Sequence, residues 1–260
     1  MIEYMRSIGP RIPAAVLALL LAGAALAQGG PARSDAAREK RWADQILPNL
    51  VVGDAVQLQG AEGRFLALYA KAEPARGAVL LAHGSGLHPD HGITGELRVH
   101  LADRGYTTLS LQMPVLPAEV DDGSAYRALF PEAAGRIAAG MQYLQERGEK
   151  RIFIVSHAMG TGMTHAYLRA NRGAPVAGWA ALSFYGVFDG ITGAAFPVLD
   201  LFGARDYRGI RNPARDRAEI LRALPNSKQL AVPEGGFFLT GGEKTVLQEV
   251  TAFLEALSAR

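Results

Sequence analysis

Residues 152–162, with the sequence IFIVSHAMGTG, combine a strand pattern with a turn of small residues and the start of a helix. Four apolar residues come first, and a helical pattern follows the glycines. Ser156 and Gly160 flank the turn with small groups, and Ala158 lies at its centre. The methyl group of an alanine has no chemistry with which to attack a carbonyl group. The turn therefore has no attacking group at its centre.

The histidines limit the remaining chemistry by their positions. They are His83, His88, His91, His100, His157 and His165, and none follows residue 165. The spacing of His88, Asp90 and His91 matches half of a dinuclear zinc motif, but the other half would need a histidine where Gly86 stands. We therefore expect an ordinary loop there, with no metal and no other cofactor, and keep a metal-dependent hydrolase as a weaker alternative.

The pattern of apolar residues predicts alternating strands and helices along most of the chain. Strands are expected at 55–59, 65–70, 78–82, 106–111, 152–155, 176–183, 196–201 and 229–232. Helices are expected at 38–46, 97–104, 126–148, 160–170, 215–224 and 244–257. This order predicts an α/β fold, with a mostly parallel, doubly wound sheet and an antiparallel edge hairpin formed by the first two strands. The loops after residues 82, 155, 201 and 232 should converge at one edge of that sheet.

Four stretches resemble the α/β-hydrolase family, in particular poorly characterised exported bacterial proteins of that fold. They are VLLAHGSGLHPDHG at 79–92, YTTLSLQMPVL at 106–116, IVSHAMGTGM at 154–163 and VLDLFGARD at 198–206. The resemblance implies the α/β-hydrolase fold and a catalytic serine, acid and histidine in that chain order. No long insertion lies between residues 183 and 196, so we expect no separate cap domain and an open cleft.

In this resemblance the nucleophile position falls on Ala158 and the acid position on Asp206, with Asp189 as the fallback. The histidine position falls on Gly236, and no histidine follows the acid that could replace it. Two of the three triad members are therefore expected to be absent, and triad members act as a unit.

The backbone around the turn should still form an oxyanion site. The resemblance assigns its donors to the N–H of Met159 and to that of Gly84 or Ser85, and Gly160 allows the helix to pack closely. A turn of the usual shape would hold Ala158 at positive φ, at a cost of roughly 1–2 kcal/mol.

Three residues are weak candidates for a displaced catalytic group: Ser156, His157 and His83. Ser156 fits the elbow pattern badly and should pack under the turn. A pair of Ser85 with His157 is conceivable, although a loop serine and a histidine pointing away from the cleft are the simpler interpretation.

The first 27 residues read as a signal peptide, with Arg6 and Arg11 before an apolar core and an A-x-A site before Gln28. Residues 28–53 should form a tether and a short helix, and 54–260 one hydrolase-like domain. We expect a periplasmic or secreted protein after cleavage near Ala27, with a membrane contact only through an uncleaved signal segment. The alternative for this segment is a membrane anchor, which its short apolar run disfavours.

The composition limits the kinds of partner that we expect this protein to bind. The 260 residues carry a net charge of +2, contain no cysteine and are 49% hydrophobic, which suits one large core without disulfides. The sequence has no basic stripe of the kind that would indicate a nucleic-acid partner. We expect an exported protein that binds a small-molecule or acyl ligand, or a periplasmic protein, without catalysis. The alternative is a hydrolase of esterase or acyl-transfer type that uses displaced residues.

Overall fold

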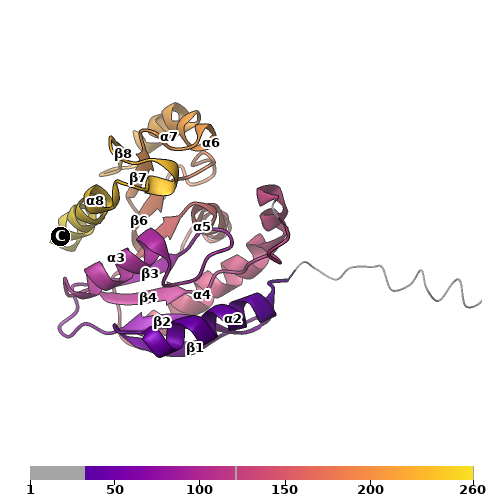
Figure 1. Cartoon of the computed structure of the whole chain (residues 1–260). Helices are drawn as coiled ribbons and strands as arrows, with labels where there is room; N and C mark the ends of the chain where they lie inside the picture. Colours follow the sequence, from indigo (N-terminus) through magenta and orange to yellow (C-terminus); the bar gives the residue numbers. More distant parts are fainter. Residues whose placement is uncertain (1–32, 121, 260) are drawn as a thin grey trace, which may run out of the picture. The chain divides into compact units, whose positions relative to one another are not determined.

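The computed structural model describes residues 33–120 and 122–259, so the predicted signal peptide lies outside the described residues. One eight-stranded sheet forms the centre of the domain, in the spatial order β1-β2-β4-β3-β5-β6-β7-β8 (Figure 1). The strands are β1 (Asp54–Gly60), β2 (Gly63–Ala70), β3 (Ala78–Ala82), β4 (Thr107–Leu111), β5 (Ile152–His157), β6 (Val176–Leu182), β7 (Val198–Gly203) and β8 (Lys228–Val232).

The sheet is parallel except at one edge. β1 and β2 form an antiparallel hairpin in which Gly60 pairs with Gly63, and β2 also runs antiparallel to β4. From β4 to β8 every neighbouring pair is parallel. The predicted mostly parallel sheet with an antiparallel edge hairpin is therefore confirmed.

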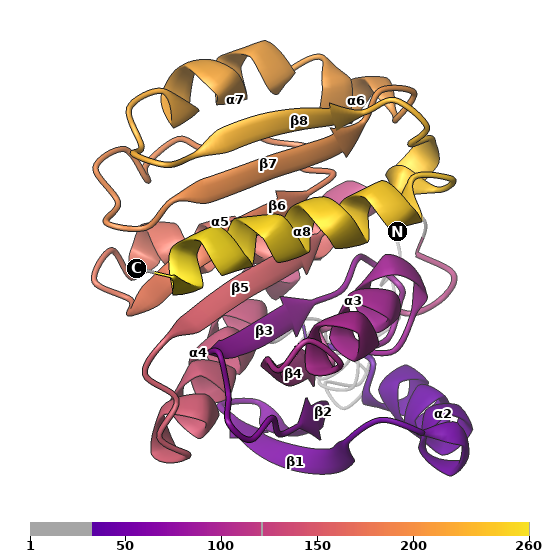
Figure 2. The same cartoon turned by 90° about the vertical axis from the view of Figure 1, so that its left-hand side faces the viewer.

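Helices cover both faces of the sheet, as Figure 2 shows. α3 (Gly92–Ala102) and α8 (Glu243–Ser258) lie on one face, and α4 (Phe130–Glu146) and α5 (Met159–Ala170) lie on the other. Because both faces are covered, β3 and β5 are buried along their whole length, which explains why β3 is apolar throughout and β5 is apolar from residue 152 to 155.

The N-terminal helix α2 (Ala36–Ile46) packs on the hairpin, where Ile46 joins a small cluster with Leu66 and Leu68. The Asp35 side chain accepts from the Arg38 backbone N–H and caps the helix. The Arg38 guanidinium donates to the carbonyls of Leu116 (2.7 Å) and Gly86 (3.3 Å). α2 thus braces the loop that follows β3.

The structure departs from the predicted elements most clearly at three places. The helix expected over 126–148 begins as the 3₁₀ helix η2 (Gly123–Leu129), and α4 starts only after it, with Pro131 in its first turn, where a proline is well tolerated. The helix expected at 97 begins at Gly92. The last predicted pair of helices is preceded by a short helix, α6 (Arg208–Arg211), which the sequence pattern did not indicate.

The connection between β6 and β7 contains neither helix nor strand, so this part of the fold carries no cap domain. α7 (Ala214–Leu221) flanks the far edge of the sheet. In the described part of the chain, no helix combines the length and apolar character needed to cross a membrane.

Candidate functional site

The turn after β5 has the shape of a nucleophile elbow. Ala158 lies between β5 and α5 at φ 52° and ψ −116°, so the expected positive φ is confirmed. Its N–H donates to the Leu182 carbonyl at 2.9 Å. A Cβ atom at Gly160 would lie 2.4 Å from the His83 carbonyl oxygen and 2.5 Å from that of Ala82, so only glycine allows this approach of α5 to β3.

The loop after β3 lies directly beside the elbow. A Cβ atom at Gly84 would come within 3.4 Å of the Ala158 methyl group. Met159 is the first residue of α5, and N–H groups in a first helical turn have no acceptor within the helix. Ser85 is exposed on the same loop. The structure therefore brings together Gly84, Ser85 and Met159, the residues expected to form the oxyanion site.

His83 is a structural residue of that loop. The Met113 N–H donates to its Nε2 at 2.9 Å, so the proton is on Nδ1, which donates to the Gly84 carbonyl at 2.8 Å. Burial lowers the pKa of His83 to about 3. A neutral imidazole with both nitrogens engaged holds the loop in place and has no ring nitrogen left to activate a nucleophile.

Asp206 is buried just after β7 and is the centre of a small hydrogen-bond network. Its Oδ2 accepts from the Ser183 hydroxyl at 2.7 Å. Its Oδ1 accepts from the backbone N–H groups of Tyr207 at 2.8 Å and Phe238 at 3.0 Å. The carboxylate therefore joins the loops after β6, β7 and β8.

The loop after β8 reaches Asp206 through a backbone N–H rather than through an imidazole. Phe238 has a left-handed backbone with φ 51°, and its ring lies edge-on to His157 at a centroid distance of 5.6 Å. Gly236, the expected histidine position, lies two residues earlier, where its N–H donates to the Thr240 carbonyl. Asp206 thus accepts from the backbone N–H of Phe238, whereas a triad acid accepts from an imidazole N–H, and the sequence pattern did not single Phe238 out.

The backbone is strained around this network. Ala158, Ser183 and Phe238 all have positive φ, although none of them is glycine. Left-handed conformations of such residues cost about 1–2 kcal/mol and are found mainly at functional sites. The proximity of all three to the Asp206 network marks this edge of the sheet as the candidate site.

Ser156 and His157 are both buried. The Ser156 hydroxyl accepts from the Trp179 indole N–H at 2.8 Å, so it packs beneath the turn, as expected. Burial lowers the pKa of His157 to about 4, and the charge of nearby Asp206 opposes this shift. His157 is therefore neutral at pH 7.

Asp189, the fallback acid, lies on the loop after β6 and not near Asp206. Its carboxylate pairs with Arg169 at 3.0 Å, and its backbone carbonyl lies 2.8 Å from His165 Nε2. It therefore anchors that loop to α5.

The residues of the partial zinc motif are used differently. The Arg98 guanidinium donates to Asp90 at 3.0 Å, and the His88 ring lies against Trp42 and His91. Within residues 33–120 and 122–259, no three His, Cys, Asp or Glu side chains gather closely enough to hold a metal ion.

A cleft of about 630 Å³ opens beside Ala158. α5 contributes Met159 and Gly162 to its wall, and η2 contributes the exposed Arg127. The aromatic side chains that line it are Phe130, Phe184 and Tyr185. A second hollow of about 280 Å³ shares Ser85 with this cleft and is lined by His157, Phe238 and the carboxylates Glu96 and Glu243.

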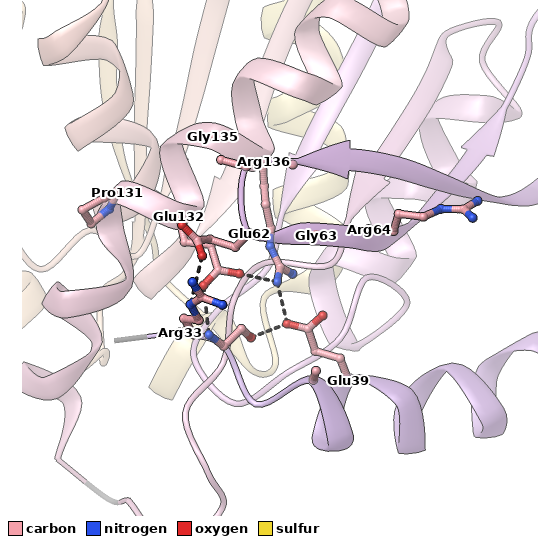
Figure 3. A pocket seen from close by; sticks show the side chains of 13 residues that line it. Arg33, Glu39, Glu62, Gly63, Arg64, Pro131, Glu132, Gly135 and Arg136 are labelled. Carbon is pink, nitrogen blue, oxygen red and sulfur yellow. Dashed lines mark hydrogen bonds and ion pairs between the residues drawn. The ribbon is translucent and has the colours of Figure 1, made fainter. Parts of the chain in front are cut away.

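A third hollow, of about 440 Å³, lies at the N-terminal side and has a different character (Figure 3). Arg136 of α4 lies between Glu39 of α2 and Glu132, and Arg33 pairs with Glu62 at 3.0 Å. These charges satisfy one another and join α2 to α4 and the hairpin. The hollow is therefore best explained as a structural junction.

Comparisons with known proteins agree with the fold. Residues 22–134 match the model of a family described as a protein of unknown function (DUF3530). No protein with a curated description matches the sequence. Est1E from Butyrivibrio proteoclasticus is 14% identical, with a TM-score of 0.63 over 79% of this chain and 99% of that one.

Two further solved structures are similar. A dienelactone hydrolase from Anabaena variabilis is 17% identical, with a TM-score of 0.65 over 78% of this chain and 96% of that one. An esterase from Pyrococcus furiosus is 13% identical, with a TM-score of 0.61 over 79% of this chain and 97% of that one. At such identities the likeness concerns the fold, and the chain has the α/β-hydrolase fold.

Proposed function

We propose that this protein binds a small organic ligand in the cleft beside Ala158 and does not hydrolyse it. One observation carries the proposal: the elbow holds its central residue in the strained conformation used to present a nucleophile, but that residue is an alanine. A strained conformation persists only where the surrounding structure imposes it. The binding half of a hydrolase site is therefore retained without its attacking group.

The network around Asp206 supports the same proposal. A triad acid orients an imidazole, whereas this carboxylate accepts from a serine hydroxyl and two backbone N–H groups. No histidine follows residue 165, and the loop after β8 reaches Asp206 with the backbone N–H of Phe238. Asp206 then serves to fix three loops around the cleft.

Neighbouring folds suggest the kind of ligand. Est1E has been solved with ferulic acid bound, which shows that a cleft of this fold accommodates a small aromatic molecule in that protein. On the basis of the predicted signal peptide, we propose that the protein acts in the periplasm or outside the cell, where it would meet free organic ligands or a partner protein.

The proposal is tested by one NMR experiment that follows binding and hydrolysis together. Purified protein is mixed with ethyl 4-phenylbutyrate, and saturation transfer to the ester is recorded before and after overnight incubation. We expect transfer to an ester that stays intact. Gly162→Leu, which fills the cleft from α5, should abolish the transfer while the circular dichroism spectrum is unchanged. Protein-dependent release of ethanol would contradict the proposal.

Reintroducing the serine and the histidine of a triad tests which position would hold the histidine, the missing general base. Ala158→Ser with Phe238→His should yield measurable p-nitrophenyl acetate turnover, because the ring at position 238 lies against His157, next to the elbow, and the backbone of the same residue is bound to Asp206. General-base catalysis contributes about 10²- to 10⁴-fold, so we expect at least about 100-fold over Ala158→Ser alone. Ala158→Ser with Gly236→His is the matched comparison. Greater activity in the latter would return the base position to residue 236.

The displaced-residue hydrolase remains the alternative. Ser85 and His157 line one hollow, and Asp206 lies close enough to His157 to affect its pKa. A base with a pKa near 4 is poorly matched to activating a serine at neutral pH. A fluorophosphonate adduct on Ser85, located by peptide mass spectrometry, would favour this alternative.

A further inference from the structure

We propose that the ligand of the cleft is an organic anion whose carboxylate is bound by the arginines that line the cleft, Arg127 above all, with an apolar or aromatic body along the remaining wall. This inference rests on the proposed function, because it assigns a ligand class to the same cleft.

Two elements each contribute one arginine to the lining of the cleft. Arg127 is exposed on η2 and makes no ion pair with any residue that the structure describes. Arg169 projects from α5 and pairs with Asp189 at 3.0 Å, and Gly190 leaves room for its side chain. One carboxylate against two guanidinium groups leaves a net positive charge in the cleft. Arginine also suits a carboxylate geometrically, since its planar fork can donate two parallel hydrogen bonds.

Other groups in the cleft add to this preference. Ala158 is the N-cap residue of the 12-residue helix α5, so the positive end of the helix dipole adds positive potential at the elbow wall of the cleft, whereas Arg169 lies in the last turn of the same helix. Burial raises the pKa of Tyr185 to about 12, which keeps its hydroxyl protonated as a donor. Burial also lowers the pKa of His165, which remains uncharged.

The apolar part of the lining defines the rest of the ligand. Phe130, Phe184 and Tyr185 line the cleft together with Met159 and Val187. The Phe184 ring is fixed by stacking on Phe188, with centroids 5.3 Å apart. Rigid aromatic walls favour a flat or extended hydrocarbon body.

The neighbouring hollow gives the ligand a direction. Its carboxylates, Glu96 and Glu243, lie beyond the shared residue Ser85, so they repel an anion that would enter from that side. The anionic group is therefore directed away from this hollow and toward the arginines of the cleft. In the N-terminal hollow, by contrast, Arg136 and Arg33 are already paired with glutamates, and the Arg64 side chain points away from them (Figure 3).

The test compares 4-phenylbutyrate with its neutral amide, 4-phenylbutanamide, by isothermal titration calorimetry. We expect the acid to bind at least five-fold more tightly than the amide. Arg127→Gln should remove most of that preference, and Arg169→Gln should reduce it less because Arg169 already has a carboxylate partner. Arg64→Gln, an exposed arginine of the N-terminal hollow, should leave it unchanged.

Equal affinities for acid and amide would overturn the anion assignment, and so would the absence of binding by both. A preference for the acid that survives Arg127→Gln together with Arg169→Gln would also overturn it. The proposed function is tested on the neutral ethyl ester, through saturation transfer and ethanol release. A protein that binds this ester intact but does not prefer the acid loses only the anion assignment, whereas turnover of the ester or the absence of transfer contradicts the proposed function, so the two failures are distinguishable.

Discussion

The elbow after β5 and the loops after β7 and β8 differ from a catalytic site in opposite ways. The elbow has the conformation without the chemical group, since Ala158 keeps φ 52° but has only a methyl group. The loops after β7 and β8 keep the carboxylate of the acid position, Asp206, but in another arrangement. This carboxylate accepts from the Ser183 hydroxyl and from the backbone N–H of Phe238. The shape of the elbow is imposed by close packing of α5 on β3. The position of Asp206 depends on polar contacts that a few substitutions can redirect.

The largest expected effect concerns the packing that imposes the elbow. Gly160→Ala would place a methyl group 2.4 Å from the His83 carbonyl oxygen, and backbone atoms cannot yield as a flexible side chain does. We expect a loss of about 4 kcal/mol in the free energy of unfolding, measured by urea denaturation.

The matched control is Gly135→Ala in α4, where a new Cβ atom meets nothing within 4 Å. It should stabilise the protein by about 0.5–1 kcal/mol through helix propensity. Similar stabilities for the two variants would show that packing does not impose the elbow.

The next largest expected effect concerns the loops after β7 and β8, which Asp206 holds together. Asp206→Ala would leave the Ser183 hydroxyl and the N–H groups of Tyr207 and Phe238 without their acceptor. Unsatisfied buried groups cost about 1–3 kcal/mol each and relax in part, so we expect a loss of about 3 kcal/mol. Asp103→Ala, at an exposed helix end, should change stability by less than about 0.5 kcal/mol. If Asp206→Ala is neutral in the same denaturation assay, the carboxylate does not organise these loops.

His157 connects the two regions and should make stability depend on pH. Its folded pKa of about 4 lies below the unfolded value of 6.5, so the unfolded chain binds the proton first as pH falls. The contribution is complete above pH 6.5 and is lost down to about pH 4, amounting to about 3 kcal/mol. Denaturation curves of the wild type and His157→Gln should therefore converge over this window. Parallel pH profiles would rule out a buried, neutral His157.

The smallest effect isolates the strain at Ala158. Ala158→Gly should raise stability by about 0.5–1 kcal/mol, because glycine adopts positive φ without steric cost. Ala180→Gly, in the buried strand β6, should lower stability by about 1 kcal/mol. Equal losses in the two variants, measured by thermal denaturation, would mean that the elbow conformation carries no strain.

The sequence predicts the structure well where a single local physical cause determines it. The continuous apolar pattern of β3 predicts its limits, 78–82, because that strand is buried on both faces. The positive φ of Ala158 follows from a strand, a tight turn and a close-packed helix in succession. The start of α4 was missed because apolar spacing is similar in a 3₁₀ turn and in the helix that follows it.

The polar partners in the site were less predictable. Ser183 and Phe238 reach Asp206 from two other loops, and nothing in their local sequence reports a contact made across the sheet edge. A serine directly after a buried strand was the available signal for Ser183. The pairing of Gly235 and Gly236 marks a tight loop but does not show which following residue turns toward the acid. Arg127 was missed because an exposed arginine on a helix is ordinary until a cleft is seen beside it.

The most direct test of the central claim is p-nitrophenyl acetate hydrolysis by purified protein, compared with Asp206→Asn and followed by intact-mass analysis after fluorophosphonate treatment. We expect both proteins to hydrolyse the ester no faster than buffer alone does, and we expect no fluorophosphonate adduct on either. Turnover by the wild type that Asp206→Asn abolishes, together with an adduct on one serine, would contradict the central claim.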